Sequence, residues 1–309
     1  MGLVGRVSGS DRGDRSNRRA NMPFLFVHPS HGIRVVRRTL DEVASVARLG
    51  SDPTRPLIVT DPLLASGDDK GEIEIGLVYY RAGYTPTDYR SSRDWETRIM
   101  VERSRAIKCP SLALQLAGAK KVQQVLAETG MVEKYLLGQN QQGDFDETDC
   151  DLLRKTFTDL YPLDDSELGR HAYDLAVNSP EKYVLKPQRE GGGNNIYRAD
   201  IPPFLQKLEA EPTGPGEPPK KEGYILMSLI EPPLGLKNLL VKGGSKEAVE
   251  GEVVSELGVY GISLFGPGET GSKMEVNRGA GTLLRTKGRE SDEGGVAVGY
   301  SVVDSVVLV

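Results

Sequence analysis

Residues 186–195 read KPQREGGGNN and follow the short apolar segment 183–185, which the pattern predicts as a β-strand. The three consecutive glycines allow the backbone to adopt positive φ angles and to approach a ligand closely. Successive exposed N–H groups in such a loop form a nest that binds anions. Lys186 adds a positive charge suited to phosphate, and Glu190 adds a carboxylate suited to Mg²⁺. A glycine run alone is typical of a flexible turn, but these charged neighbours favour a loop that binds nucleotide phosphates.

The best-known nucleotide-binding motifs are missing from the sequence. No G-x-x-x-x-G-K-[ST] motif occurs, which argues against a P-loop of that type. No G-x-G-x-x-G motif follows a first strand, which disfavours a dinucleotide-binding fold. The sequence therefore indicates an ATP site of another architecture, in which lysines on strands and a glycine loop hold the triphosphate.

A second glycine-rich region lies near the C-terminus, where LLRTK at residues 283–287 precedes GGVAVG at residues 294–299. Arg285 and Lys287 alternate along an extended chain, so their side chains are expected on the same face. The glycines that follow would place backbone donors beside an anion held by the two cations. Taken alone, a strand followed by a surface hairpin explains the pattern slightly better.

A third candidate is the segment Arg81-Ala82-Gly83-Tyr84, at the end of the apolar strand predicted for residues 73–80. In open α/β sheets, ligands collect at the carboxyl ends of strands. Arg81 is suited to pairing with a substrate carboxylate through two parallel hydrogen bonds. Without further context, an ordinary exit from a strand into a loop explains this segment better.

Alternating strands and helices predict a layered, mixed α/β fold. Thr39 and Glu42 form a capping-box pattern at the start of a helix that extends to residue 48, and Trp95 is expected in the core. Residues 1–22 are rich in arginine, glycine and serine and are expected to form a disordered leader. The other predicted helices are 94–108, 116–128, 152–160, 166–177 and 201–209, and the other predicted strands are 33–36, 57–59, 183–185, 224–230 and 253–264.

Composition narrows the functional class further. The net charge of −5 over 309 residues argues against a nucleic-acid-binding protein, which typically carries a basic face. No apolar run approaches the roughly 20 residues that a membrane-spanning helix needs. The two cysteines cannot form a disulfide framework and suggest a reducing compartment, and the three histidines leave little room for a zinc site.

Several of these motifs together resemble the eukaryotic-type glutathione synthetase family. The resemblance runs from His31 to Val309 and rests on KPQREGGGNN, LLRTK, GGVAVG, LAGAKKVQQ at residues 116–124, YILMSLIE at residues 224–231 and SELG at residues 255–258. It implies an ATP-grasp fold and a cytoplasmic homodimer that uses ATP and Mg²⁺. It also implies the ligation of γ-glutamylcysteine to glycine through an acyl phosphate, which yields glutathione, ADP and phosphate.

The resemblance also implies a set of site residues. Glu190 would be the Mg²⁺ ligand, and Arg285 would be both catalytic and substrate-binding. The other residues implied to bind γ-glutamylcysteine are Arg81, Ala82, Gly83, Tyr84, Val296 and Ala297. The residues implied to bind ATP are Lys120, Lys186, Pro187, Gln188, Arg189, Glu190, Gly191, Gly192, Gly193, Asn194, Asn195, Tyr197, Met227, Ser228, Leu229, Ile230, Glu256, Lys287 and Glu293, the last of these standing where the family usually has Asp.

The domain organisation is expected to be a leader at residues 1–30, an α/β substrate-binding domain at residues 31–118 and an ATP-grasp domain at residues 119–309. The family is longer and carries further Mg²⁺ ligands in its N-terminal region, so the resemblance implies an ATP-grasp fold that is incomplete at the N-terminus. Two functions follow. One is an ATP-dependent carbon–nitrogen ligase, with glycine or β-alanine as the acceptor. The alternative is an ATP-binding fragment or pseudo-enzyme that cannot complete the metal site.

Overall fold

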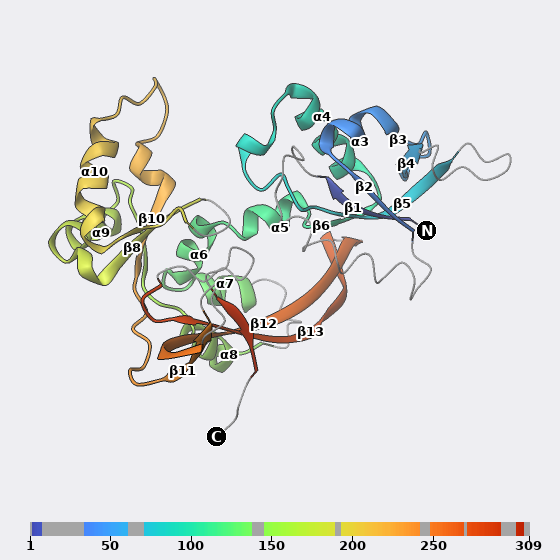
Figure 1. Ribbon diagram of the computed structural model, residues 1–309. Helices are drawn as coiled ribbons and strands as arrows, with labels where there is room; N and C mark the ends of the chain where they lie inside the picture. The colour runs from blue at the N-terminus through green and yellow to red at the C-terminus, as the bar shows by residue number, and fades with distance from the viewer. Residues whose placement is uncertain are drawn as a thin grey trace. The chain divides into compact units, whose positions relative to one another are not determined.

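The computed structural model describes residues 2–7, 34–60, 71–137, 145–188, 193–241, 248–268, 271–291 and 301–305. The chain divides into two compact units (Figure 1), Met1–Glu190 with Asn194–Leu229, and Gly191–Gly193 with Ile230–Val309. The expected boundary between residues 118 and 119 lies inside the first unit, between two helices.

The first unit contains a six-stranded sheet with the order β2-β1-β5-β4-β3 and with β6 paired to β5. Strands β1, β2, β5 and β6 run parallel, whereas β4 is antiparallel to both of its neighbours. The mixed α/β class expected from the sequence is therefore confirmed. The strands are β1 (Gly2–Val7), β2 (Arg34–Arg38), β3 (Ala47–Leu49), β4 (Leu57–Thr60), β5 (Glu72–Tyr79) and β6 (Ile107–Cys109).

The sequence predicted a disordered leader, but six of its residues, Gly2–Val7, form strand β1. It lies between β2 and β5 and pairs with both, so it is an interior strand of the sheet. Leu3, Val4 and Val7 provide the apolar and β-branched side chains that favour extended backbone. The short apolar run was not recognised as a strand, because the composition of residues 1–22 is dominated by arginine, glycine and serine.

Two helices accompany the first sheet, α3 (Leu40–Val46) and α4 (Ser92–Arg103). The capping box predicted at Thr39 and Glu42 is confirmed, since the Glu42 N–H donates to the Thr39 hydroxyl and the Thr39 N–H to the Glu42 carboxylate. Both helices end earlier than predicted, because the residues after each one enter strands β3 and β6. Pairing with a sheet here overrides the local helical pattern.

The position of Trp95 was predicted wrongly. Its side chain is 45% exposed, and its ring stacks on Tyr89 with the centroids 3.9 Å apart. The buried face of α4 is partly polar. Its residues are Asp94, Thr97, Arg98 and Val101. The core beside it is built around Ile75, Val78 and Val101.

Four short helices follow, α5 (Leu112–Ala117), α6 (Lys120–Ala127), α7 (Met131–Leu136) and α8 (Glu147–Arg154). The single helix predicted over residues 116–128 is divided, because α5 ends at its C-cap Gly118 and α6 begins after Ala119. Gly130 is the N-cap of α7 with a φ of 80°. Leu116 is 62% exposed.

A four-stranded antiparallel sheet completes the first unit, in the order β7-β10-β8-β9. Its strands are β7 (Leu160–Pro162), β8 (Tyr183–Pro187), β9 (Ile196–Tyr197) and β10 (Tyr224–Ser228). Helices α9 (Glu167–Asn178) and α10 (Ile201–Ala210) pack on one face of it, where Ala172 and Leu205 meet Leu185 and Leu226 in a second core. The 3-10 turns of the first unit are η2 (Pro86–Asp88), η3 (Pro180–Lys182), η4 (Arg198–Asp200) and η5 (Lys220–Gly223).

The second unit is a sheet in the order β11-β12-β13-β14. Its strands are β11 (Lys237–Val241), β12 (Ala248–Gly268), β13 (Gly271–Gly288) and β14 (Val302–Asp304). Strands β12 and β13 form a long antiparallel ribbon, which extends beyond the strand predicted at residues 253–264. Its apolar residues include Leu257 and Val259, which are 55% and 78% exposed.

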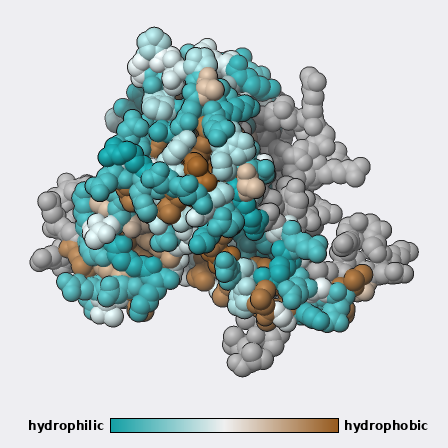
Figure 2. Space-filling view, turned by 90° about the vertical axis from the view of Figure 1, so that its left-hand side faces the viewer, coloured by the Kyte–Doolittle hydropathy of each residue, from teal (hydrophilic) through white to brown (hydrophobic). Residues whose placement is uncertain are grey.

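Exposed apolar side chains occur across the molecule. Figure 2 shows one face, on which hydrophobic side chains form separate patches between hydrophilic ones. Among the helices of the described ranges, none is both long enough and apolar enough to cross a bilayer.

Helices α7 and α8 are joined by an ion pair whose strength should depend on pH. Arg154 donates from Nε and Nη2 to the two carboxylate oxygens of Glu133, each at 2.6 Å. These hydrogen bonds lower the pKa of Glu133 to about 2 from its ordinary value of 4.5. Because the pKa is lower in the folded state, the stabilisation is fully present above pH 4.5 and is lost as the pH falls towards about 2.

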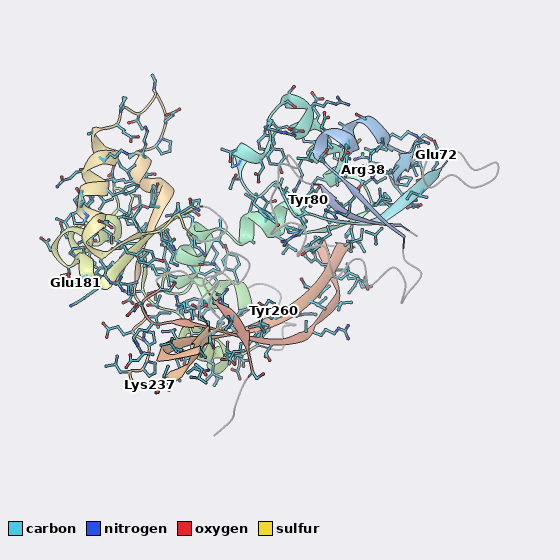
Figure 3. The ribbon with its side chains drawn as sticks, viewed as in Figure 1. Arg38, Glu72, Tyr80, Glu181, Lys237 and Tyr260 are labelled. Carbon is cyan, nitrogen blue, oxygen red and sulfur yellow. The ribbon has the colours of Figure 1, made fainter. Side chains whose placement is uncertain are left out.

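We therefore expect Glu133→Gln to be less stable than the wild type at neutral pH. The difference should shrink as the pH falls below 4.5, because Glu133 of the unfolded wild type then takes up a proton, whereas the folded carboxylate, with its pKa of about 2, remains ionised. Urea unfolding between pH 7 and roughly pH 3 measures this convergence. Glu181→Gln, at an exposed glutamate labelled in Figure 3, is the matched control and should show no such trend. A stability difference that stays constant across the range would contradict the assignment.

Candidate functional site

Strand β8 places Lys186 opposite the core. Side chains alternate along the strand, so Tyr183 and Leu185 enter the core beneath α9 and α10, while Lys186 lies on the other face. Residues paired directly across antiparallel strands share a face. The pairs Lys186 with Ile225, Val184 with Met227 and Val184 with Tyr197 therefore put Lys186, Met227 and Tyr197 on one side of the sheet. Three residues predicted to bind ATP from separate motifs are brought together here.

Helix α6 contacts strands β7 and β10 and carries Lys120 as its first residue. The backbone N–H of Lys121 donates to Oε1 of Gln188 at 2.9 Å, which ties the start of α6 to the segment directly after Lys186 and Pro187. The Lys120 ammonium lies 3.4 Å from Oε1 of Gln123, one turn along the helix. The first N–H groups of a helix and its dipole favour anions, so both lysine and backbone suit phosphate.

The segment 227–230, predicted to contact adenine, is where the chain passes from the first unit to the second. Ser228 donates its N–H to the carbonyl of Asp159 at 3.0 Å, and Leu229 donates to the carbonyl of Lys182 at 2.8 Å. Leu229 is the last residue of the first unit, and Ile230 belongs to the second and is 72% exposed. The backbone of this segment is thus anchored up to Leu229.

The glycine loop is described only at its end. Gly193 has a φ of 86°, and a Cβ placed there would meet no atom within 4 Å. This agrees with the positive φ expected of the glycine run. There is space for a side chain at Gly193, so glycine is favoured here by its backbone conformation alone. Asn195 donates from Nδ2 to the Tyr197 hydroxyl at 3.0 Å, which fixes the return of the loop to β9. The predicted residues outside the described ranges are Arg189, Glu190, Gly191, Gly192, Glu293, Val296 and Ala297.

Glu190, the predicted Mg²⁺ ligand, lies outside the described residues. Among the residues that the structure describes, no group of three or more His, Cys, Asp or Glu is arranged to hold a metal ion.

The second unit brings Glu256, Arg285 and Lys287 together. Glu256 pairs directly with Arg285 across β12 and β13, and the Arg285 guanidinium contacts Oε2 of Glu256 through Nε at 2.7 Å and Nη2 at 2.5 Å. The Lys287 ammonium lies 3.8 Å from Oε1 of the same carboxylate. Both cations therefore lie on one face, as their alternation predicted, and the single carboxylate of Glu256 offsets part of their charge.

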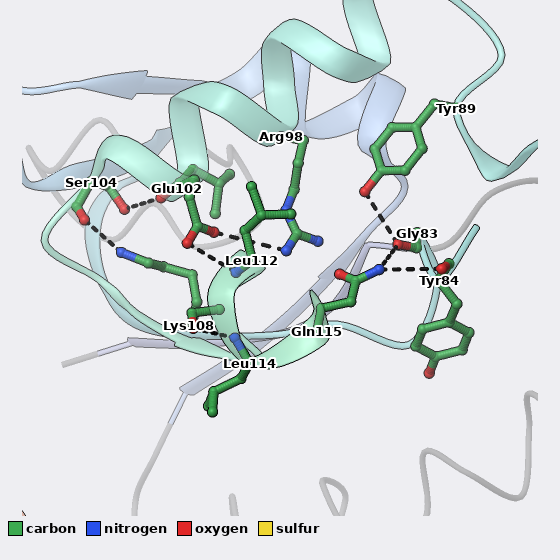
Figure 4. Close-up of polar contacts among 12 residues, drawn as sticks. Gly83, Tyr84, Tyr89, Arg98, Glu102, Ser104, Lys108, Leu112, Leu114 and Gln115 are labelled. Carbon is green, nitrogen blue, oxygen red and sulfur yellow. Dashed lines mark hydrogen bonds and ion pairs between the residues drawn. The ribbon is translucent and has the colours of Figure 1, made fainter. Parts of the chain in front are cut away.

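The segment Arg81–Tyr84 forms a tightly held loop after β5. Oδ2 of Asp88 accepts hydrogen bonds from three successive backbone N–H groups, those of Gly83 at 3.1 Å, Tyr84 at 2.8 Å and Thr85 at 3.2 Å. Gly83 has a φ of 82°, and a Cβ at this position would lie 2.8 Å from the Tyr89 hydroxyl oxygen. That hydroxyl donates to the Gly83 carbonyl at 3.3 Å (Figure 4). Glycine is required here by conformation and by space.

With this geometry established, comparison with known proteins identifies the family. A family model described as "Eukaryotic glutathione synthase, ATP binding domain" matches residues 17–308. This chain belongs to that family. Glutathione synthetase of Solanum lycopersicum, a chloroplastic protein, is 39% identical over 279 residues, which cover 90% of this chain and 44% of the relative. Glutathione synthetase of Homo sapiens is 39% identical over 276 residues, which cover 89% of this chain and 51% of the relative.

The chain of this glutathione synthase family member thus spans about half the length of the relatives it matches. A solved structure, a glutathione synthetase-like effector from Globodera pallida in its apo form, aligns with a TM-score of 0.60 and 21% identity. The alignment covers 98% of this chain and 56% of that one. At this identity the likeness concerns the fold alone, and it supports the ATP-grasp architecture that the sequence resemblance implied.

Sequence reasoning missed a buried cluster in this glutathione synthase family member. The guanidinium of Arg98, which is 4% exposed, lies 3.9 Å from the ring centroid of Tyr80, labelled in Figure 3. Oε2 of Glu102 is 3.8 Å from the guanidinium, and burial raises the pKa of Tyr80 and, more weakly, that of Tyr89. A cation over an aromatic ring is stabilised even when water is excluded. In the sequence, the only indication of this cluster is Arg98 itself, at a position of α4 that faces Tyr80, directly after β5.

Gly83→Ala should be markedly less stable than the wild type. A non-glycine residue in left-handed conformation costs about 1–2 kcal/mol, and here the new Cβ also meets the Tyr89 hydroxyl. The matched control is Gly216→Ala, because Gly216 has a φ of 81° but no atom within 4 Å of an added Cβ. Denaturant unfolding should show a larger loss for Gly83→Ala than for Gly216→Ala. Equal losses would show that the loop yields to the added carbon.

Proposed function

We propose that this chain carries the ATP-binding part of a glutathione synthase, which joins γ-glutamylcysteine to glycine with the hydrolysis of ATP to ADP and phosphate. The observation that supports it most directly is the common face of the β7–β10 sheet on which Lys186, Met227 and Tyr197 lie. These residues come from separate parts of the sequence, and each one matches a motif of the family. Membership of the family supports the reaction class.

In this proposal the reaction proceeds in two steps. The cysteinyl carboxylate of γ-glutamylcysteine attacks the γ-phosphorus of ATP, which gives an acyl phosphate and ADP. The amine of glycine then attacks the acyl carbon, an amide bond forms, and phosphate leaves. Phosphoryl transfer of this kind needs positioning and charge neutralisation more than a nucleophilic side chain.

The residues of each unit would take separate parts in this chemistry. In the first unit, Lys120 and Lys186 bind phosphate oxygens, Met227 contacts the adenine, and Arg81 pairs with a carboxylate of the dipeptide. Glu190 holds Mg²⁺, which when bound neutralises part of the phosphate charge.

In the second unit, Arg285 binds the dipeptide while Lys287 and Glu256 contact ATP. Since Glu256 occupies the guanidinium of Arg285, an anionic substrate has to compete with that carboxylate.

The finer features of the proposal are the use of Mg²⁺, a homodimeric assembly and a cytoplasmic location. They are supported by the family resemblance and, for the location, by two cysteines that are both free. The choice of glycine over β-alanine as the acceptor also belongs to the proposal.

The test is an assay of the purified chain with Mg²⁺-ATP, γ-glutamylcysteine and glycine. We expect phosphate release that requires both co-substrates, together with the appearance of glutathione. Replacing glycine by β-alanine should lower the rate. Binding of ATP without turnover would overturn the ligase assignment and favour an ATP-binding fragment of the same family. Faster turnover with β-alanine would overturn the choice of acceptor.

Lys186→Gln should weaken ATP binding without unfolding the protein. Hydrogen bonds to a charged group contribute about 1.5–3 kcal/mol, so the dissociation constant should rise roughly tenfold or more. Isothermal titration with ATP measures the change. Lys207→Gln, at an exposed position of α10, is the matched control and should bind as the wild type does. Equal affinities of the two variants would remove Lys186 from the nucleotide site.

A further inference from the structure

Gln115 of α5 contacts the backbone of the loop that follows β5. Its Nε2 donates to the carbonyl of Gly83 at 2.8 Å and lies 3.3 Å from the carbonyl of Tyr84 (Figure 4). Gln115 and the loop are more than thirty residues apart in sequence, and no motif points to the contact. An amide N–H₂ group has two donors, which suits two adjacent carbonyls.

The contact completes the anchoring of this loop. Asp88 already accepts from the N–H groups of Gly83, Tyr84 and Thr85, so Gln115 holds the carbonyl side of the backbone that Asp88 holds on the amide side. Because these backbone groups are already hydrogen-bonded within the protein, a ligand would contact the loop through its side chains. Tyr84 is 39% exposed, in keeping with such a platform.

Helix α5 is itself held in place at its start. The N–H of Leu112 donates to Oε1 of Glu102 at 3.0 Å, and the hydroxyl of Ser111 accepts from the N–H of Leu114 at 3.3 Å. Glu102 belongs to α4, so α5 is fixed to the first sheet's own helix before it reaches the loop. Because α5 is held independently of the loop, Gln115 can fix the position of the loop.

The same helix leads directly to the lysine proposed to bind ATP. Only Gly118 and Ala119 separate the end of α5 from Lys120 at the start of α6. On the far side, the N–H of Lys121 donates to Oε1 of Gln188 at 2.9 Å, next to the phosphate-loop segment. The short stretch from Gln115 to Lys121 is thus bonded at both ends, through the Gln115 side chain to the carbonyls of Gly83 and Tyr84 and through the Lys121 N–H to the Gln188 side chain.

We propose that Gln115 is a positioning residue, which fixes the loop Arg81–Tyr84 in register with the start of α6. It touches neither ATP nor the dipeptide and acts through the backbone of Gly83 and Tyr84. This inference rests on the proposed function for the identity of the ligand, γ-glutamylcysteine, but not for the anchoring of the loop.

The test compares Gln115→Glu and Gln115→Met with the wild type and with Gln206→Glu, a control at an exposed glutamine of α10. Glutamate has the same shape but no donor at neutral pH, so it faces two carbonyl oxygens with a negative charge. Methionine has a similar length and leaves the carbonyls without their partner. Melting temperatures first establish that each variant is folded.

Two readouts are then measured. Amide hydrogen exchange of the peptides that cover residues 83–85 should be at least about threefold faster in both Gln115 variants and unchanged in Gln206→Glu. In the ligase assay the KM for γ-glutamylcysteine should rise about tenfold in Gln115→Glu, as the loss of the hydrogen bonds to the Gly83 and Tyr84 carbonyls implies, while the KM for ATP changes less than twofold.

Unchanged exchange in both Gln115 variants would overturn the proposal, and so would an equal rise in both KM values, which indicates a general loss of structure. If the wild-type chain forms no glutathione, the proposed function fails, and the exchange measurement alone decides. Faster exchange in the two variants would then still support Gln115 as the anchor of the loop.

Discussion

The antiparallel pairing of β8 with β10 is the constraint on which the first unit's candidate site depends. It sets which side chains share a face, and it does so for two chain segments that are about forty residues apart. Leu185 and Leu226 enter the core under α9 and α10, and the residues that follow them, Lys186 and Met227, must then lie on the opposite side. The burial of two leucines thereby places a cation and a thioether side chain together on the face that we propose binds the nucleotide.

A second constraint is the saturation of backbone hydrogen bonds in the loop after β5. A loop with unpaired N–H and C=O groups would have several conformations of similar energy. The hydrogen bonds of Asp88 and Gln115 favour one of them. Gly83 allows the turn in which both anchors are within reach. The conformation of this loop is held by polar contacts, whereas strands β8 and β10 are held in place by apolar burial as well as by their backbone pairing.

Much of the fold could be predicted from local patterns. The capping box at Thr39 and the helix starts predicted at residues 166 and 201 were all confirmed within one residue, because each depends on residues within one turn. The ends of α3 and α4 could not be predicted, since they are decided by strand pairing with β4 and β5. The same holds for β1, whose six residues acquire their structure from two neighbours that are distant in sequence. Among site residues, the alternation of Arg285 and Lys287 was predictable, whereas the roles of Asp88, Arg98 and Gln115 depend on long-range contacts that no local pattern reveals.

The alternation along β8 limits how this sequence can change over evolution. Insertion or deletion of a single residue between Tyr183 and Lys186 would exchange the two faces, so that the lysine would enter the core and a leucine would meet the ligand side. Substitutions in the strand can be judged one position at a time, but a change in its length alters core and chemistry together. Length variation among descendants of this chain is therefore expected in its surface segments, such as the proline-rich stretch 211–222, and not in this five-residue strand.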